Sequence, residues 1–216
     1  MRLSAIGMVV ERGGRLVLSA PDFTVEAGQT AVLRGPNGAG KSTLLRALAA
    51  LVPLASGDAR LNDVSLASDG EDFAAHVAYA GHLDAVKPAL TVRENLESWA
   101  AIYGASVGDG LARFALDHIA DLPAGFCSAG QKRRLGLSRL TVMGRPLWLL
   151  DEPTVSLDAA SVALFSDLVR DHCAGGGVAI AATHVDIGLP PGPVVEIAAP
   201  EAVVADQADP FLEDWG

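Results

Sequence analysis

The chain has 216 residues, the length of one sizeable domain, and 50% of them are hydrophobic. Its formal net charge of −10 argues against a nucleic-acid partner held by a broad basic face, because neutralised phosphates supply most of such an affinity. No apolar run approaches the roughly 20 residues that span a membrane, no signal peptide is recognisable, and the two cysteines, Cys127 and Cys173, are too few for a disulfide framework. The composition therefore predicts a cytoplasmic domain whose thiols are reduced and packed as small apolar groups.

In the first half of the chain, strands precede and follow one helix. Short apolar runs predict three strands, at 15–19, 29–35 and 76–81. After the second of these strands, the spacing of the apolar residues changes from that of a strand to that of a helix. A helix is expected to start at Lys41, to stop before Pro53 and to place four apolar side chains on one face: Leu44, Ala47, Leu48 and Leu51.

The next segment has the spacing of helices. Residues 92–103 carry apolar side chains at helical intervals, and Gly104 can end that helix. A second helix is expected near 110–120, and a third begins at Ser128, a residue type that is favoured at N-caps.

Two near-continuous apolar runs, 146–152 and 177–184, are typical of central parallel strands that are covered on both faces. A helix is expected between them at 158–173, with Asp158 as its N-cap. The whole pattern predicts an α/β fold in which a helical insertion, at roughly 84–138, interrupts a sheet.

The segment GPNGAGKST lies between an expected strand and an expected helix, as a phosphate-binding loop must. Its glycines allow close backbone approach, its amides can bind phosphate oxygens, Lys41 can reach the β- and γ-phosphates, and the Ser42 hydroxyl can bind Mg²⁺. A glycine-rich turn could carry this pattern by chance, but the flanking elements favour the phosphate site. The sequence therefore predicts that ATP is bound by nine residues: Gly35, Pro36, Asn37, Gly38, Ala39, Gly40, Lys41, Ser42 and Thr43.

An acidic pair follows the apolar run in LWLLDEP. Asp151 is expected at the carboxyl end of a buried strand, where α/β sheets bind ligands. There it would hold Mg²⁺ together with Ser42, and Glu152 would polarise the attacking water. Such a pair alone is as often a turn or a helix cap, but downstream of a phosphate-binding loop it indicates a hydrolytic site.

Three further motifs complete a pattern that resembles the ATP-binding cassette (ABC) ATPases, a family of P-loop NTPases, over about residues 3–198. In that family, the signature sequence contacts the γ-phosphate of ATP held by the opposite subunit, and its equivalent here is Ser128, Ala129, Gly130 and Gln131. VSLD resembles the D-loop and ends at Asp158. AATH ends at His184, which matches the switch histidine that contacts the γ-phosphate.

The resemblance implies an α/β fold of the ABC type, with a RecA-like parallel-sheet core, an N-terminal antiparallel β subdomain and an inserted helical subdomain. It implies one ABC ATPase domain at 1–200, followed by an acidic tail at 201–216. ATP and Mg²⁺ are the implied cofactors, and a homodimer of ATPase subunits is the implied assembly. Glu152, His184 and His82 are the implied catalytic residues.

Two positions depart from the usual pattern of the family. A glutamine normally ends the strand before the helical lobe, near the γ-phosphate and the membrane subunit, and here that position is His82. A histidine at this place could also be a packing residue or a haem ligand. Many ABC ATPases stack adenine on an aromatic residue ahead of the P-loop, and here that position is Arg12, whose guanidinium can also stack on a base.

The segment YAGHLDAVKPALTVRENL, together with SAGQ, is similar to the ATP-binding subunits of bacterial cytochrome c maturation systems. This resemblance implies haem export, or release of a haem-chaperone complex, at the cytoplasmic face of the inner membrane. The implied partners are integral membrane permease subunits (CcmB-like, with CcmC- and CcmD-like partners) and no nucleic acid. The alternative is a soluble ABC ATPase that acts on nucleic acid or ribosomes, although such proteins usually carry long coiled coils or two cassettes.

Overall fold

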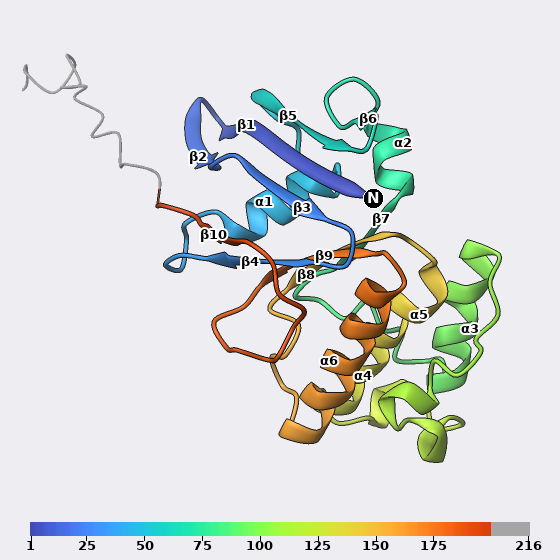
Figure 1. Cartoon of the computed structure of the whole chain (residues 1–216). Coiled ribbons are helices and arrows are strands. Elements are labelled where there is room, and N and C mark those ends of the chain that lie inside the picture. Colours follow the sequence, from blue (N-terminus) through green and yellow to red (C-terminus); the bar gives the residue numbers. More distant parts are fainter. Residues whose placement is uncertain (200–216) are drawn as a thin grey trace, which may run out of the picture.

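The computed structural model describes residues 1–199. An antiparallel sheet and a parallel sheet enclose one helix, and further helices cover the other face of the parallel sheet (Figure 1). The acidic tail expected at 201–216 lies outside the described residues. Within residues 1–199, no helix combines the length and the apolar character that crossing a membrane requires.

An antiparallel sheet occupies the N-terminal part of the chain. Its strands are ordered β2-β1-β5-β6, and β3 also pairs with β1. The strands are β1 (Arg2–Arg12), β2 (Arg15–Ser19), β3 (Phe23–Glu26), β5 (Ser56–Leu61) and β6 (Val64–Ser65). The expected strand at 15–19 is therefore confirmed as β2.

A parallel sheet forms the centre of the molecule, in the order β10-β4-β9-β8-β7. Its strands are β4 (Thr30–Arg34), β7 (Val77–Ala80), β8 (Leu147–Asp151), β9 (Val178–Ala182) and β10 (Val194–Glu196). All five residues of β8 and all five of β9 are buried, as expected for central strands with both faces covered.

Helices lie on both faces of the parallel sheet (Figure 1). They are α1 (Lys41–Leu48), α2 (Gly70–Ala75), α3 (Val92–Tyr103), α4 (Ala129–Ser138), α5 (Leu140–Met143) and α6 (Ala159–Ala174), with short 3-10 helices η1 (Ala112–Phe114), η2 (Asp117–Ile119) and η3 (Ala124–Phe126). Successive side chains of β8 point to opposite faces of the sheet and so enter two different cores. Leu149 packs in the core shared with α1 and the antiparallel sheet, whereas Leu150 packs in the core shared with α3 to α6.

Two details of the helices differ from expectation. Near 110–120 there is no continuous helix, because Ala115 has φ 51° in the left-handed region and separates η1 from η2. Leu51 does not share the buried face of α1, since that helix ends at Leu48 and the Leu51 side chain is 63% exposed. The helix at 92–103 and its stop at Gly104, with φ 63°, are confirmed.

Candidate functional site

The predicted phosphate-binding loop connects β4 to α1. At two of its glycines the backbone has a conformation or a close contact that a residue with a side chain would not tolerate. Gly40 has φ 103° and directly precedes the first residue of α1. Gly35 has φ 140°, and a Cβ at that position would collide with the carbonyl group of Ile197. Residues with side chains are therefore disfavoured at both positions, and the amide groups at the start of α1 face the loop.

Lys41 folds back over this loop. Its Nζ donates hydrogen bonds to the carbonyl oxygens of Gly35, at 2.7 Å, and Pro36, at 3.0 Å. The residue is 8% exposed. Because an ammonium group has three N–H donors, these two bonds leave one donor for a phosphate oxygen. The loop and Lys41 together thus form a cationic cradle of the kind that binds phosphate.

Asp151 ends β8 directly opposite the loop. Its Oδ1 accepts a hydrogen bond of 2.9 Å from the Ser42 hydroxyl, and its Oδ2 accepts one of 3.2 Å from the Tyr79 hydroxyl of β7. Burial is the main cause that raises the pKa of Tyr79, so its hydroxyl stays protonated and donates to the carboxylate. Tyr79 was not identified from the sequence, although a tyrosine on the strand beside β8 is a signal for such a contact.

A cavity of about 250 Å³ lies beside these groups. It is lined by Asn37, Gly38, Gly40, Lys41, Ser42, Thr43, Asp151 and Glu152. The sequence predicted all eight residues for the ATP site. In residues 1–199 no cluster of three or more His, Cys, Asp or Glu side chains could hold a metal ion. A hydroxyl and a carboxylate are nevertheless the oxygen ligands that Mg²⁺ takes when substrate phosphates and water complete its coordination.

Glu152 and His184 meet beside this cavity. The Nε2 of His184 lies 3.4 Å from Oε1 of Glu152. They are neighbours because β8 and β9 pair in parallel, with Asp151 opposite Ala182, so the residues that follow the two strands emerge together. Glu152 has φ 46° in the left-handed region, and its amide donates to the Ala182 carbonyl oxygen at 2.9 Å. The structure therefore brings together two residues predicted from separate motifs.

The signature and D-loop residues lie outside that cavity. Ser128 caps α4 reciprocally with Gln131: its amide donates to Gln131 Oε1 at 2.8 Å, and its hydroxyl accepts from the Gln131 amide at 3.2 Å. A Cβ at Gly130 would lie 2.9 Å from the carbonyl oxygen of Ser156, so the signature packs tightly against the segment before α6. Asp158 caps α6 by accepting from the Ser161 amide at 2.8 Å, and the pKa of Asp158 is lowered first by the Ser161 side chain and then by this amide bond.

The structure leaves His82 and Arg12 exposed. His82 follows β7 in an irregular segment and does not line the 250 Å³ cavity. Arg12 ends β1 beside the β1–β2 turn. In the segment after His82, Asp84 is half-buried and forms a 2.8 Å ion pair with the buried Arg133.

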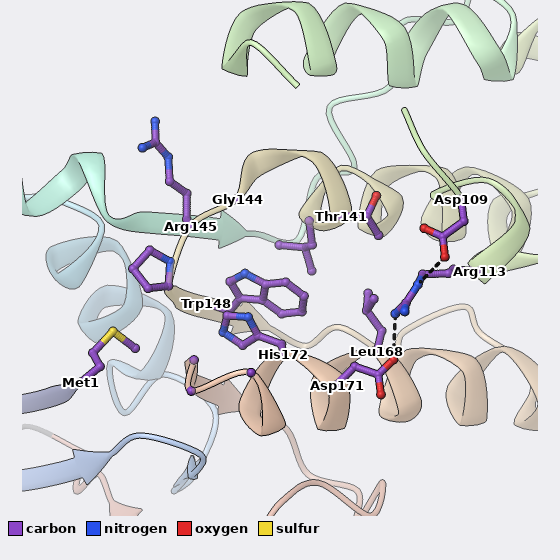
Figure 2. A pocket seen from close by; sticks show the side chains of 15 residues that line it. Met1, Asp109, Arg113, Thr141, Gly144, Arg145, Trp148, Leu168, Asp171 and His172 are labelled. Carbon is purple, nitrogen blue, oxygen red and sulfur yellow. Dashed lines mark hydrogen bonds and ion pairs between the residues drawn. The ribbon is translucent and has the colours of Figure 1, made fainter. Parts of the chain in front are cut away.

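A larger cavity, of about 580 Å³, lies near the opposite ends of the strands, between α5 and α6 (Figure 2). It contains none of the residues predicted for the site. Trp148 stacks on His172 there with ring centroids 3.8 Å apart, and burial lowers the pKa of His172. Arg113 bonds Asp109 and Asp171 at its rim, each at 3.0 Å.

Comparisons with known proteins agree with this geometry. The family model described as "ABC transporter" matches residues 18–155. The cytochrome c biogenesis ATP-binding export protein CcmA of Rhodobacter capsulatus is 52% identical over 192 residues, which cover 88% of this chain and 85% of the relative. The protein with the same name from Cereibacter sphaeroides is 50% identical over 199 residues, which cover 92% and 90%.

A solved structure, the ATP-binding subunit of an ABC transporter, matches with a TM-score of 0.76 and 24% identity, and covers 85% of this chain and 80% of that one. At this identity the match shows the fold, and the predicted ABC-type fold is confirmed. The chain belongs to the ABC transporter family, among the cytochrome c biogenesis ATP-binding export proteins named CcmA.

Proposed function

We propose that this chain binds and hydrolyses ATP as the ATPase subunit of a membrane ABC complex in cytochrome c maturation, and that it energises haem export or the release of a haem-chaperone complex. The observation that supports it most is the Glu152–His184 pair at the phosphate-binding cavity, in a chain 52% identical to a cytochrome c biogenesis export protein over 192 residues.

The phosphate groups of ATP would occupy the cavity between the loop and Asp151. The loop from Gly35 to Thr43 would surround the phosphates with its backbone N–H groups, which Pro36 alone lacks, and Lys41 would donate to the β- and γ-phosphates. Ser42 and Asp151 would hold Mg²⁺, which neutralises the charge of these phosphates when bound. Arg12 is the candidate adenine contact, through stacking of its guanidinium.

Hydrolysis requires a group that takes a proton from the attacking water. Glu152 is placed for this role, because it follows the strand that ends at the proposed Mg²⁺ ligand, it lines the cavity, and its side chain is 31% exposed. His184 lies 3.4 Å away and would contact the γ-phosphate while orienting Glu152. In the proposed step the water oxygen attacks the γ-phosphorus, the bond between the γ-phosphorus and the β–γ bridging oxygen breaks, ADP leaves with that oxygen, and the proton of the water passes to the Glu152 carboxylate.

The signature would complete the site of a second copy. Ser128, Ala129, Gly130 and Gln131 begin a capped helix. Ser128 and Ala129 are exposed and Gly130 and Gln131 are half-buried, so the start of this helix could contact ATP bound to a partner in a homodimer. Asp158 of the D-loop lies in the adjacent exposed segment.

The Ser128→Arg variant is expected to bind ATP with normal affinity as an isolated chain. It should nevertheless lose hydrolysis and cytochrome c maturation, because the bulky arginine side chain prevents the signature from contacting the ATP that is bound to the partner copy. Maturation would be measured as haem that is covalently attached to cytochrome c, in a bacterial strain that lacks its own ATPase subunit and carries either the unmodified chain or the variant. The control is Ser68→Arg, the same change at another exposed serine, which should restore maturation. Normal turnover in the Ser128 variant would contradict the composite site. Failure of the unmodified chain to restore maturation would contradict the proposed pathway.

The membrane partners would be integral permease subunits (CcmB-like, with CcmC- and CcmD-like partners), and the chain would bind them at the cytoplasmic face of the bacterial inner membrane. The alternative of a soluble ABC ATPase on nucleic acid is disfavoured by the net charge of −10. Co-purification with membrane proteins in mild detergent discriminates between the two.

His82 would link the nucleotide site to the membrane subunit. Its exposed position after β7 leaves the imidazole accessible to a docked partner, and a neutral imidazole offers one donor and one acceptor, as an amide does. His82→Gln should therefore keep ATPase activity and maturation, whereas His82→Ala should keep ATP binding but lose maturation. A haem absorption band of the unmodified chain that disappears in His82→Gln, together with lost maturation, would instead identify a haem ligand.

A further inference from the structure

Arg133 lies inside α4, two residues after the signature, and its side chain uses every donor it has. The residue is 4% exposed. Its Nε donates to the carbonyl oxygen of Pro153 at 3.0 Å, and its Nη2 to those of Glu152 at 2.8 Å and Asp151 at 3.4 Å. Its Nη1 donates to the carbonyl oxygen of Gly81 at 3.0 Å and to Oδ1 of Asp84 at 2.8 Å. All five N–H groups of the guanidinium therefore have a partner.

These five hydrogen bonds join three segments that are distant in sequence. The segments are α4, the segment after β7, and residues 151–153, which contain the acidic pair. The positive charge is costly to bury, and Asp84 supplies the carboxylate that compensates it. Asp84 is itself fixed, because Arg139 donates to its carbonyl oxygen at 2.8 Å and to that of Tyr79 at 3.0 Å.

The backbone of Glu152 needs such support. A non-glycine residue at φ 46° is strained and keeps that conformation only when its surroundings hold it there. The amide of Glu152 is held by Ala182, and its carbonyl group is held by Arg133. Without the second contact, the peptide after Glu152 could rotate and the carboxylate would move away from its position beside the cavity.

We propose that Arg133, with Asp84 as its counter-ion, is a positioning residue that holds Glu152 in the orientation needed for hydrolysis. The inference rests on the proposed function of Glu152 as the group that accepts the proton from water. It adds that the position of α4 and of the segment after β7 is transmitted to this carboxylate through a single guanidinium.

The test is Arg133→Lys, which keeps the charge but has three donors in place of five and cannot reach the same oxygens. The kcat for ATP hydrolysis should fall by roughly 10- to 100-fold, because a misplacement of about 1 Å of a catalytic group costs this much, while ATP affinity should stay within about threefold. The control is Arg113→Lys, an arginine that bonds two carboxylates at the rim of the larger cavity, which should leave kcat unchanged (Figure 2).

A double variant separates positioning from general damage. In the Glu152→Gln background, Arg133→Lys should cause no further loss of the residual single-turnover rate, because the group on which it acts is already gone. A further loss of the same size, or full kcat in Arg133→Lys alone, would overturn the proposal. If Arg133→Lys lowers the Tm strongly, Asp84→Asn replaces it: a several-fold loss of kcat at unchanged ATP affinity is expected, and normal kcat would overturn the proposal. If instead Glu152→Gln alone hydrolyses ATP normally, the proposed function of Glu152 fails and the inference that rests on it fails as well. Full kcat in Arg133→Lys, together with a strong loss of turnover in Glu152→Gln, overturns the inference alone.

Discussion

Glu152→Gln should bind ATP and Mg²⁺ with near-normal affinity but hydrolyse ATP at least about 100-fold more slowly, because an amide keeps the size of the side chain and cannot take a proton from water. The phosphate contacts of the loop and Lys41 are untouched by the change. Since the composite site is then occupied without turnover, the variant should accumulate as a head-to-tail dimer. Phosphate release measures the first effect, and size-exclusion chromatography with ATP and Mg²⁺ measures the second.

The matched control is Glu97→Gln, which removes a carboxylate from an exposed position on α3 and should leave both turnover and association unchanged. A monomer in the presence of ATP together with normal turnover would show that neither the role of Glu152 nor the shared site is correct. Loss of turnover without dimer formation would restrict the error to the shared site.

The elements that the sequence predicts best are those whose ends carry local signals. Thr91 and Glu94 form a reciprocal cap at the start of α3, and Gly104 ends it in the left-handed conformation. Near 110–120 the local signals were weaker. There the chain turns at Ala115, and Arg113 pairs both with Asp109, four residues before it, and with the distant Asp171 of α6, so a tertiary contact adds to the local one.

The same distinction applies to the site. Lys41, Asp151 and His184 were predictable as neighbours, because Asp151 ends β8, Lys41 and His184 come after β4 and β9, and these three strands are adjacent in the parallel sheet. Tyr79 and Arg133 were not, since each acts through a hydrogen bond to a residue more than 15 positions away in sequence. A motif states which residue type the chemistry needs, whereas the contacts that orient it depend on how helices pack against the sheet.

Lys41→Ala should weaken ATP binding by roughly 10- to 150-fold, since a hydrogen bond to a charged group in a partly buried site is worth about 1.5–3 kcal/mol. The isolated chain would be titrated with ATP and Mg²⁺ by calorimetry. Lys87→Ala, which removes an exposed lysine after β7, is the control and should bind normally.

The change at Lys41 also removes a donor from the loop itself, because Lys41 bonds the carbonyl oxygens of Gly35 and Pro36. Thermal unfolding without nucleotide separates the two effects: the Tm should fall by a few degrees at most, since Gly35 is only half-buried and Pro36 is exposed, so water can replace the ammonium group. At the same ATP concentration, the Tm of the unmodified chain should then rise more than that of the variant, because a ligand stabilises the folded state in proportion to how tightly it binds that state. Unchanged ATP affinity in a folded Lys41→Ala chain would refute the assignment of the loop, and with it the position of every group that is proposed to act on the γ-phosphate.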